Sequence, residues 1–423
     1  MSKNKIISAI DIGTTKIATL IASVNQEDDK ISVIGVSSTE SKGLRKSQIV
    51  DIDEAIESIT QSVESAERMA GYSISSCLTS ISGSHIESVN SKGVVAVAQP
   101  DDEISEHDVT RVIEAARAVS LPSSREILHV IPRDFKVDSQ EGVKDPVGMS
   151  GIRLEAEGHI ITGSSTAMRN ITKCVSEIGI EVEALVFSGL ASSQSVLTST
   201  EKELGVVLVD IGGGSTSVTV FVEGALSYSS VFPVGAKNIT NDLAIGLRVS
   251  LETAEKIKIG LSKVNKNNDG EDSDELDSKE LGLGDEVSKL SRKTLTEGII
   301  KPRLNEIFSM VGEELKKSGF GGATPAGVVI TGGGALTVGA IDSCKRSLSL
   351  PARVGYPKGL TGLIDEIKSP TYATAWGLIE YGLKNYKGLK SGPSIKSLSN
   401  LFQKLPVKGI LGKGVKMIKS FLP

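Results

Sequence analysis

The sequence predicts an α/β protein built from two similar lobes, with a small inserted domain and a separate tail. The first observation is an internal repeat. Residues 6–24 and 205–223 each run from an apolar strand through Asp-Ile-Gly into a β-branched strand. Asp11 and Asp210 hold the same place in the two copies, which suits two lobes that each open with a β-hairpin. The other observations are the different texture of residues 84–163 and a strongly basic C-terminus.

Length and composition restrict the class of protein. A chain of 423 residues is long enough for two or three domains. Its formal net charge of −5 is not that of a general nucleic-acid binder, which would be strongly basic. Three scattered cysteines exclude a disulfide framework. Asp11 interrupts the first apolar run, and no run approaches the roughly 18 residues of a membrane span, so we expect a cytosolic chain.

The elements of the first half follow from periodicity. After the first copy of the repeat we expect a strand at 31–37, a helix at 53–70 capped by Asp51 or Asp53, and a strand at 76–82. The inserted region 84–163 favours short strands, with one helix near 106–118 and interruptions at Pro122 and Pro132. Strands and helices alternate again over 164–210.

The second half repeats this alternation with longer helices. After the second copy we expect helix over 235–261, a polar acidic loop at 265–286 and a long helix at 293–317. A buried strand at 327–330 then ends in three glycines. A last helix at 372–386 precedes a Gly/Ser/Lys/Asn-rich linker over 387–404.

The repeated Asp-Ile-Gly turn indicates phosphate binding. A turn rich in Gly, Ser and Thr directs backbone N–H groups at phosphate oxygens, because glycine allows close approach. The aspartate at the strand end suits Mg²⁺ held through water, and Lys16 adds a cation near the first loop. One such turn is an ordinary hairpin, whereas two facing copies can hold a polyphosphate from both sides. Two hairpins with satisfied turns remain the alternative.

The remaining motifs carry less information. Gly332, Gly333 and Gly334 follow a strand, but Thr337 stands where a dinucleotide-binding motif needs its third glycine. A flat base or a ribose can approach such a loop. The pattern of a P-loop NTPase is absent, and the four histidines lack the spacing of a zinc site.

The C-terminal tail differs from the rest of the chain in charge. Nine lysines and no acidic residue follow Glu380. On a helix, the apolar residues of the last segment fall on one face, namely Ile410, Leu411, Val415, Ile418, Phe421 and Leu422. A basic amphipathic helix after a flexible linker is typical of an interfacial membrane anchor on an anionic surface. A helix that docks back on the body, or a basic partner-binding tail, is the alternative.

Together these features resemble the actin-like ATPase (ASKHA) superfamily and, within it, the FtsA family of bacterial cell-division proteins. The resemblance covers essentially the whole length. The matching pieces are SAIDIGTTKI (8–17), VDIGGGST (209–216), PVGAKNITNDLAIGL (233–247), ITGGGA (330–335), PTYATAWGL (370–378) and the linker with the basic helix.

The resemblance implies two lobes that close on ATP and Mg²⁺. The implied phosphate contacts are Gly13, Thr14, Thr15 and Lys16 in the first loop, and Gly212, Gly213, Gly214 and Ser215 in the second, with Gly235 beside it. Asp11 and Asp210 would hold the metal through waters. Glu255 and Lys258 would contact the nucleoside, and Gly332, Gly333 and Gly334 would line adenine and ribose.

The resemblance also implies subdomain boundaries. They are 1–83, 164–197 and 356–386 for subdomain IA; 84–163 for the inserted subdomain IC; 198–236 and 304–355 for IIA; 237–303 for IIB; 387–404 for a linker; and 405–423 for a membrane-targeting amphipathic helix.

The implied role is that of a division scaffold on the cytoplasmic face of the membrane at the septum. Such a protein polymerises with itself, binds the C-terminal tail of FtsZ through 237–303, and recruits downstream division proteins through the inserted region. Ala236 stands where chaperone-type relatives have a second glycine, and no glutamine or glutamate near Ser188 would activate a water. We therefore expect ATP binding with at most slow hydrolysis, and no catalytic residue is assigned.

Three other functions share the fold class. A soluble exopolyphosphatase-type phosphohydrolase has a loop like DIGGGST, but a glutamate follows it where this chain has Ser217. A sugar kinase would need a catalytic aspartate in a sugar pocket, and no candidate is found. A pilus-assembly or chaperone-like protein of this fold would leave the basic tail without a function.

Overall fold

A computed structural model describes most of the chain. The described residues are 5–25, 30–98, 103–267, 275–276, 290–359 and 361–390. The amphipathic helix predicted at 405–423, with its six apolar residues, lies outside them, as do the linker from 391 onward and most of the acidic loop at 265–286. Within the described ranges, no helix combines the length and apolar character that a bilayer span requires.

Each lobe is built on a five-stranded sheet of the same topology. The strand order is β11-β6-β1-β2-β3 in the first lobe and β18-β17-β12-β13-β14 in the second. In both, three antiparallel strands precede two parallel ones along the chain. The bounds are β1 Lys5–Ile12, β2 Lys16–Val24, β3 Ile31–Glu40, β6 Ser76–Ile81, β11 Glu181–Phe187, β12 Val206–Ile211, β13 Thr216–Val222, β14 Ala225–Phe232, β17 Val328–Thr331 and β18 Ala352–Val354. The duplication predicted from two hairpins therefore extends to the whole sheet.

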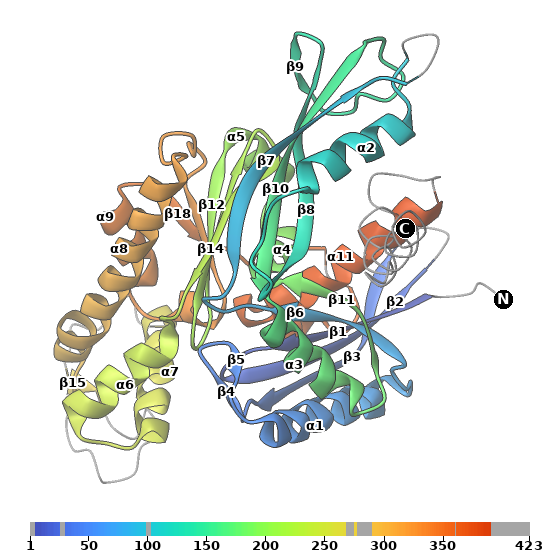
Figure 1. Cartoon of the computed structure of the whole chain (residues 1–423). Coiled ribbons are helices and arrows are strands. Elements are labelled where there is room, and N and C mark those ends of the chain that lie inside the picture. The colour runs from blue at the N-terminus through green and yellow to red at the C-terminus, as the bar shows by residue number, and fades with distance from the viewer. Residues whose placement is uncertain are drawn as a thin grey trace, which may run out of the picture.

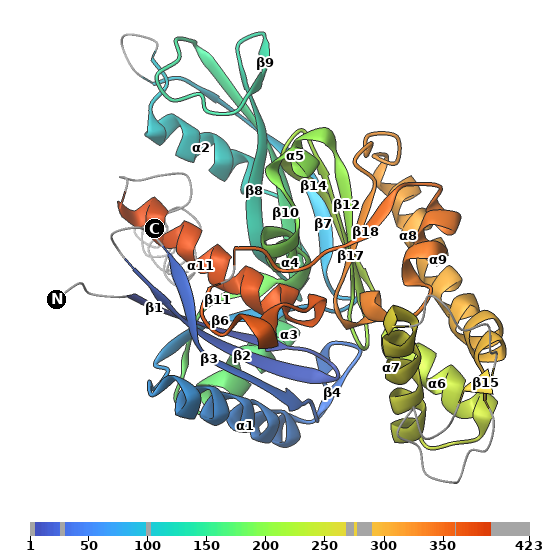
Figure 2. The ribbon, with the colours of Figure 1, turned by 180° about the vertical axis from the view of Figure 1, so that it is seen from behind.

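Helices cover both faces of the first sheet. α1 (Ile52–Ala70) and α3 (Ser165–Ser176) pack on one face, whereas α4 (Ser188–Val196) and α11 (Ala373–Lys390) pack together on the other (Figures 1 and 2). Of the two predicted caps for α1, the structure uses Asp51, whose carboxylate accepts from the backbone N–H of Glu54. α11 buries Trp376 completely and continues four residues beyond the predicted end at 386.

Helices of the second lobe differ from the expectation in two places. The predicted run over 235–261 is two helices, α6 (Ala236–Leu247) and α7 (Leu251–Asn267), because Arg248 adopts φ 57° and ends α6. The predicted helix at 293–317 begins as a π-helix, η1 (Thr294–Ile300), before α8 (Lys301–Ser318). Pro302 explains this change, since a proline cannot donate to the carbonyl four residues earlier and its ring displaces that carbonyl.

The inserted domain is a four-stranded sheet with one helix. Strands β7 (Glu87–Ala96), β10 (Arg153–Ser164), β8 (Arg125–Val137) and β9 (Gln140–Val143) lie in that order, and α2 (Glu106–Arg117) packs on β7 and β10. The expectation of short strands was wrong, since β7, β8 and β10 have 10, 13 and 12 residues. Pro132 does not break β8, because it lies beside a bulge where β9 no longer pairs.

The insert leaves the first lobe but also contacts the second (Figure 1). The Ser88 hydroxyl donates to the Ser229 carbonyl (2.7 Å) and accepts from the Ser229 N–H (3.1 Å). Asn90 donates to the Ser227 carbonyl at 3.1 Å. Side chains of β7 thus cover the outer edge of β14, which would otherwise be an open sheet edge.

Three hydrophobic cores match this architecture. The first fills the first lobe and continues onto one face of the second lobe's sheet, the second lies within the second lobe, and the third lies in the insert. Shorter elements complete the described chain. They are β4 Leu44–Arg45, β5 Gln48–Ile49, α5 Ser199–Leu204, β15 Glu275–Leu276, β16 Leu290–Ser291, η2 Gly333–Leu336, α9 Ala340–Leu348, α10 Ile364–Ile367 and η3 Pro370–Tyr372.

The fit of α2 on β7 depends on Gly93. A Cβ at this position would lie under 3.0 Å from the Val112 carbonyl and the Ala116 N–H group of α2. Gly93→Ala should therefore destabilise the insert by about 1–3 kcal/mol, the usual effect of overpacking. Gly158→Ala is the matched control, because its Cβ would meet nothing closer than 3.7 Å. Thermal unfolding of both variants tests this, and an unchanged Gly93→Ala would contradict the packing described.

Candidate functional site

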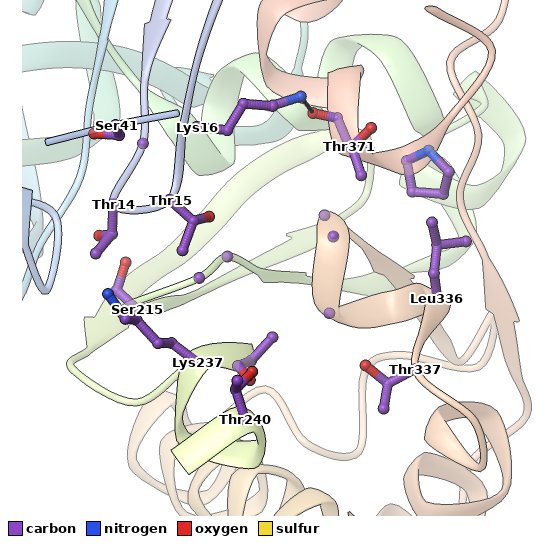
Figure 3. A pocket seen from close by; sticks show the side chains of 18 of the residues that line it. Thr14, Thr15, Lys16, Ser41, Ser215, Lys237, Thr240, Leu336, Thr337 and Thr371 are labelled. Carbon is purple, nitrogen blue, oxygen red and sulfur yellow. Dashed lines mark hydrogen bonds between the residues drawn. The ribbon is translucent and has the colours of Figure 1, made fainter. Parts of the chain in front are cut away.

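A cleft of about 1180 Å³ separates the two lobes. Its walls come from the β1–β2 and β12–β13 turns, from α6 and α7, and from the short helices η2 and η3. Figure 3 shows Thr14 and Ser215 at one end of this cleft and Leu336 and Thr337 at the other. Of the residues predicted to bind nucleotide or metal, all but Gly214 and Gly235 line it.

The two predicted phosphate loops have the same backbone geometry. The Gly13 N–H donates to the Lys16 carbonyl at 3.0 Å, and the Gly212 N–H donates to the Ser215 carbonyl at 2.9 Å. The loops also face each other closely. A Cβ on Gly213 would lie 2.5 Å from Cγ2 of Thr15. Only glycine allows this approach, so the duplicated motif forms one site rather than two separate hairpins.

Gly214 and Gly235 shape the second loop, Gly214 on the side of the first loop and Gly235 from behind. A Cβ on Gly214 would lie 2.6 Å from Oγ1 of Thr14. A Cβ on Gly235 would lie 2.6 Å from the carbonyl oxygen of Gly212. The next two N–H groups, of Ala236 and Lys237, donate to the carbonyls of Gly212 and Gly213 at 2.9 and 2.8 Å. The start of α6 therefore fixes this loop, and Gly235 supports the site rather than lining it.

Ser47 joins the two loops, and the sequence analysis did not identify it. It lies at the tip of the β4–β5 hairpin with φ 61°. Its N–H donates to Oγ1 of Thr14 at 2.8 Å, and its hydroxyl oxygen lies 2.7 Å from that of Ser215. The stretch around it resembles no phosphate motif, so only the tertiary structure reveals this contact between the lobes.

The two aspartates are buried at the centre of the cleft. The Ser80 hydroxyl donates to Asp11 at 2.7 Å, and the Thr374 hydroxyl donates to Asp210 at 3.3 Å. Burial raises the pKa of Asp11. Burial, together with the charge of Asp11, raises the pKa of Asp210 to about 6. A divalent cation would relieve this repulsion, so the pair fits Mg²⁺. No cluster of three or more metal-ligating side chains occurs among the described residues.

Lys16 lines the cleft next to these carboxylates. Its ammonium donates to the Thr371 carbonyl at 2.6 Å and lies 3.8 Å from the centre of the Tyr372 ring. Burial lowers the pKa of Lys16 to about 8, although Asp11 and Asp210 oppose that shift. Lys16 is thus within reach of the first loop, as predicted, but its partners belong to η3.

Glu255 and Lys258 form an ion pair on α7, in which Lys258 is buried and Glu255 is partly exposed. The Lys258 ammonium lies 2.7 Å from the Glu255 carboxylate and donates to the Thr240 hydroxyl at 2.9 Å. The Thr240 hydroxyl in turn donates to Glu255. This network joins α6 to α7 on the second-lobe side of the cleft. It holds a carboxylate in one orientation, where it can accept hydrogen bonds.

The glycines after β17 lie opposite this pair. Gly332 has φ 80°, and a Cβ there would lie under 3.0 Å from a carboxylate oxygen of Asp210. Gly333 and Gly334 begin η2, and Leu336 and Thr337 continue the wall. The strand end therefore presents a flat backbone surface beside the buried Asp210 carboxylate.

Three serines form a cluster of hydroxyl groups in the cleft. The hydroxyl oxygen of Ser217 lies 3.3 Å from those of Ser82 and Ser188. All three line the cleft. Ser217 is also the position at which an exopolyphosphatase-type loop has its glutamate. A hydroxyl cluster hydrogen-bonds to a phosphate or a water, but it does not remove a proton efficiently at neutral pH.

Comparison with known families agrees with this geometry. The model for the SHS2 domain inserted in FtsA matches residues 83–162, and the model for the cell division protein FtsA matches residues 207–377. The cell division protein FtsA of Pseudomonas aeruginosa is 40% identical over 413 residues, covering 96% of both chains. The chain belongs to the FtsA family of cell-division proteins.

Other members of the FtsA family are similar to this chain over most of its length. The FtsA proteins of Neisseria meningitidis and Escherichia coli K12 are 40% and 36% identical, covering 90% of this chain and 91% of each relative. The SHS2 match at 83–162 confirms that the fold carries an FtsA-type inserted domain. A role in cell division, rather than the phosphohydrolase alternative, follows from this membership.

Solved structures confirm the actin-like fold. A chain of the PilM–PilN type IV pilus biogenesis complex has a TM-score of 0.61 at 15% identity, covering 89% of this chain and 98% of that one. MreB5 of Spiroplasma citri bound to AMPPNP has a TM-score of 0.54 at 13% identity, covering 92% and 99%. The FtsA-family chain thus shares the predicted two-lobed fold with both.

The raised pKa of Asp210 has a consequence for stability. The folded chain binds this proton more tightly than the unfolded chain, whose aspartate titrates near 3.8. The free energy of unfolding therefore falls as pH rises from about 4 through about 6, because Asp210 then ionises in a buried place. Without divalent metal, Asp210→Asn should be more stable than the wild type by about 2 kcal/mol at pH 7.5, and this gain should shrink toward pH 4.5.

Thermal unfolding in EDTA at the two pH values measures this difference. Asp365→Asn is the control, because Asp365 is an exposed aspartate on α10. A gain of equal size at both pH values would show that the charge of Asp210 is not its cause.

Proposed function

We propose that this FtsA-family chain binds Mg-ATP between its lobes and acts as a membrane-tethered, self-assembling scaffold in cell division. The observation that supports this most directly is the pair of facing glycine loops, since such loops surround a polyphosphate with backbone N–H groups. The cleft is also large enough for a nucleotide, because sites for small ligands commonly enclose about 300–1,000 Å³.

The polarity of the cleft suggests how ATP lies in it. The phosphates belong on the cleft side of Gly13–Thr15 and Gly212–Ser215, where N–H and hydroxyl groups of both lobes converge. The nucleoside belongs toward η2, with the Glu255 carboxylate as acceptor for ribose hydroxyls and Gly332–Gly334 beside the base. Asp11 and Asp210 would hold Mg²⁺ through its waters, and the ion would neutralise phosphate charge when bound.

The serine cluster favours ATP as a structural ligand rather than a rapidly consumed substrate. Ser82, Ser188 and Ser217 can orient a water near the last phosphate, but none can act as an effective base near neutral pH. Bound ATP would still connect the lobes, because each contributes one loop. We therefore propose at most slow hydrolysis, with nucleotide binding as the event that controls lobe closure.

The scaffold part of the proposal rests on family membership and on the tail sequence. The FtsA family supports FtsZ as a partner, with its C-terminal tail bound by 237–303, together with downstream division proteins and further copies of the chain. The nine lysines that follow Glu380 and the predicted apolar face within 405–423 support attachment to an anionic membrane surface. We therefore propose that the protein acts on the cytoplasmic face of the membrane at the septum.

A carboxylate in the second loop tests ATP binding. Gly213→Asp should lower ATP affinity at least a hundredfold, because its side chain collides with Thr15 and its charge repels phosphate. Gly322→Asp makes the same change at an exposed position where a Cβ meets nothing within 4 Å, and it should bind ATP like the wild type. Calorimetric titration with Mg-ATP distinguishes them. Unchanged affinity of Gly213→Asp would overturn the proposed phosphate site.

Sedimentation with anionic liposomes tests the tail. Ile418→Glu combined with Phe421→Glu places two charges on the predicted apolar face, so membrane binding should be lost while ATP binding persists. A chain truncated after residue 404 should behave in the same way. If the double variant lost both activities, the tail would not be an independent anchor. If the wild type ignored lipid with and without Mg-ATP, membrane tethering would be wrong.

A further inference from the structure

The ammonium of Lys16 is held by a segment from the far end of the chain. It donates to the Thr371 carbonyl at 2.6 Å across 355 residues of sequence, a contact drawn in Figure 3. The face of the Tyr372 ring lies 3.8 Å from the same nitrogen. A lysine nitrogen this close to a ring centre is well within cation–π range.

The segment that supplies these partners is itself fixed. Ser369 caps the turn, since its hydroxyl oxygen accepts from the Thr371 N–H and hydroxyl at 3.4 and 3.0 Å. The Ser195 hydroxyl donates to the Ala373 carbonyl at 2.7 Å. One turn further on, Thr374 donates to Asp210 of the other lobe. The carbonyl and ring that meet Lys16 are therefore anchored to both lobes.

This arrangement orients the Lys16 ammonium but leaves part of its hydrogen-bonding capacity unused. A lysine ammonium has three donors. The Thr371 carbonyl takes one and the Tyr372 ring covers a second side, while no other hydrogen-bond acceptor for this nitrogen occurs in the described part of the chain. The remaining donor lies in the cleft that contains both glycine loops.

We infer that Tyr372 is a positioning residue that holds the Lys16 ammonium in place for a nucleotide phosphate. The inference rests on the proposed ATP binding and adds to it a residue outside both loops. A long lysine side chain loses rotamer freedom when it binds a ligand. The ring and the carbonyl impose that order before ATP arrives, and the ring compensates in part for the removal of the charge from water. Tyr372 acts only through Lys16, so its effect requires a phosphate.

Titration of the full chain with Mg-ATP and with adenosine tests this. Tyr372→Leu removes the ring face and should weaken ATP binding about tenfold, as expected for loss of a partly buried cation–π contact. Adenosine has no phosphate, so its affinity should stay the same. Tyr372→Phe keeps the ring and should restore ATP affinity. Tyr381→Leu is the matched control on α11, where the ring contacts His129 instead, and it should bind ATP like the wild type.

A double-mutant cycle separates positioning from packing. In a Lys16→Met background, Tyr372→Leu should cause no further loss of ATP affinity, because the residue it positions is gone. Additive losses, or an equal loss of adenosine affinity, would show that Tyr372 only supports the fold and would overturn the inference. If Tyr372→Leu does not fold, Tyr372→Met fills the space without a ring and is judged by the same criteria.

The outcome for the wild type distinguishes the two claims. If the wild-type chain binds no ATP, the proposed function fails, and the inference fails with it. If the wild type binds ATP and Tyr372→Leu binds it equally well, only the positioning role of Tyr372 is wrong.

Discussion

The close approach of two glycine loops is the constraint on which the rest of the structure depends. Thr14 and Thr15 of the first lobe touch the Cα positions of Gly214 and Gly213 in the second, with no room for a Cβ. The Ser47 hydroxyl completes the contact by reaching Ser215. Because each loop ends the first strand of a five-stranded sheet, this contact fixes the two sheets relative to each other at the cleft. The aspartates, Lys16 and the cleft walls lie where they do as a consequence. The packing of α4 and the bonds of the insert to β14 join the lobes elsewhere.

Charge is concentrated at this contact at a cost to stability. Asp11, Asp210 and Lys16 are withdrawn from water together, and each of their pKa values is shifted toward the neutral form. A site of this kind is typical of places where a protein sacrifices stability for binding. In the proposed function, Mg²⁺ and the phosphates supply the opposite charges, so ligand binding and closure of the lobes would stabilise each other. Ser82, Ser188 and Ser217 fit a nucleotide that stays bound, because none of them is an effective base for its hydrolysis.

The inserted domain also links the two lobes. It emerges from the first lobe between β6 and α3, yet its strand β7 covers the edge of β14 in the second lobe. His159 strengthens this seam, because its ring lies 2.7 Å from the Asn90 oxygen and 3.0 Å from the Ser229 hydroxyl. Burial lowers the pKa of His159 to about 3, so the seam stays neutral at cellular pH. Any change in the angle between the lobes must therefore move the insert or break these bonds.

Local patterns in the sequence determined much of this protein. The Asp-Ile-Gly repeat predicted two similar lobes, the alternation of strands and helices predicted the fold class, and the change in texture located the insert. These features are recognisable because turn chemistry and hydrophobic periodicity depend on neighbours in the chain. The same locality explains the errors, since the long strands of the insert and the break at Arg248 depend on pairing and packing partners that lie elsewhere.

Only the tertiary structure decided which distant residues complete the site. Ser47 lies in a segment without a recognisable motif, and the PTYATAWGL piece at 370–378 indicated no role for Thr371 or Tyr372. Gly235 proved to support a loop rather than line the cleft. Such roles arise when hydrogen bonds and close contacts join residues hundreds of positions apart, and no sequence period encodes that proximity. The sequence by itself determined that two phosphate loops exist. The tertiary structure decided that they face each other, because only folding brings Gly213 and Thr15 into contact.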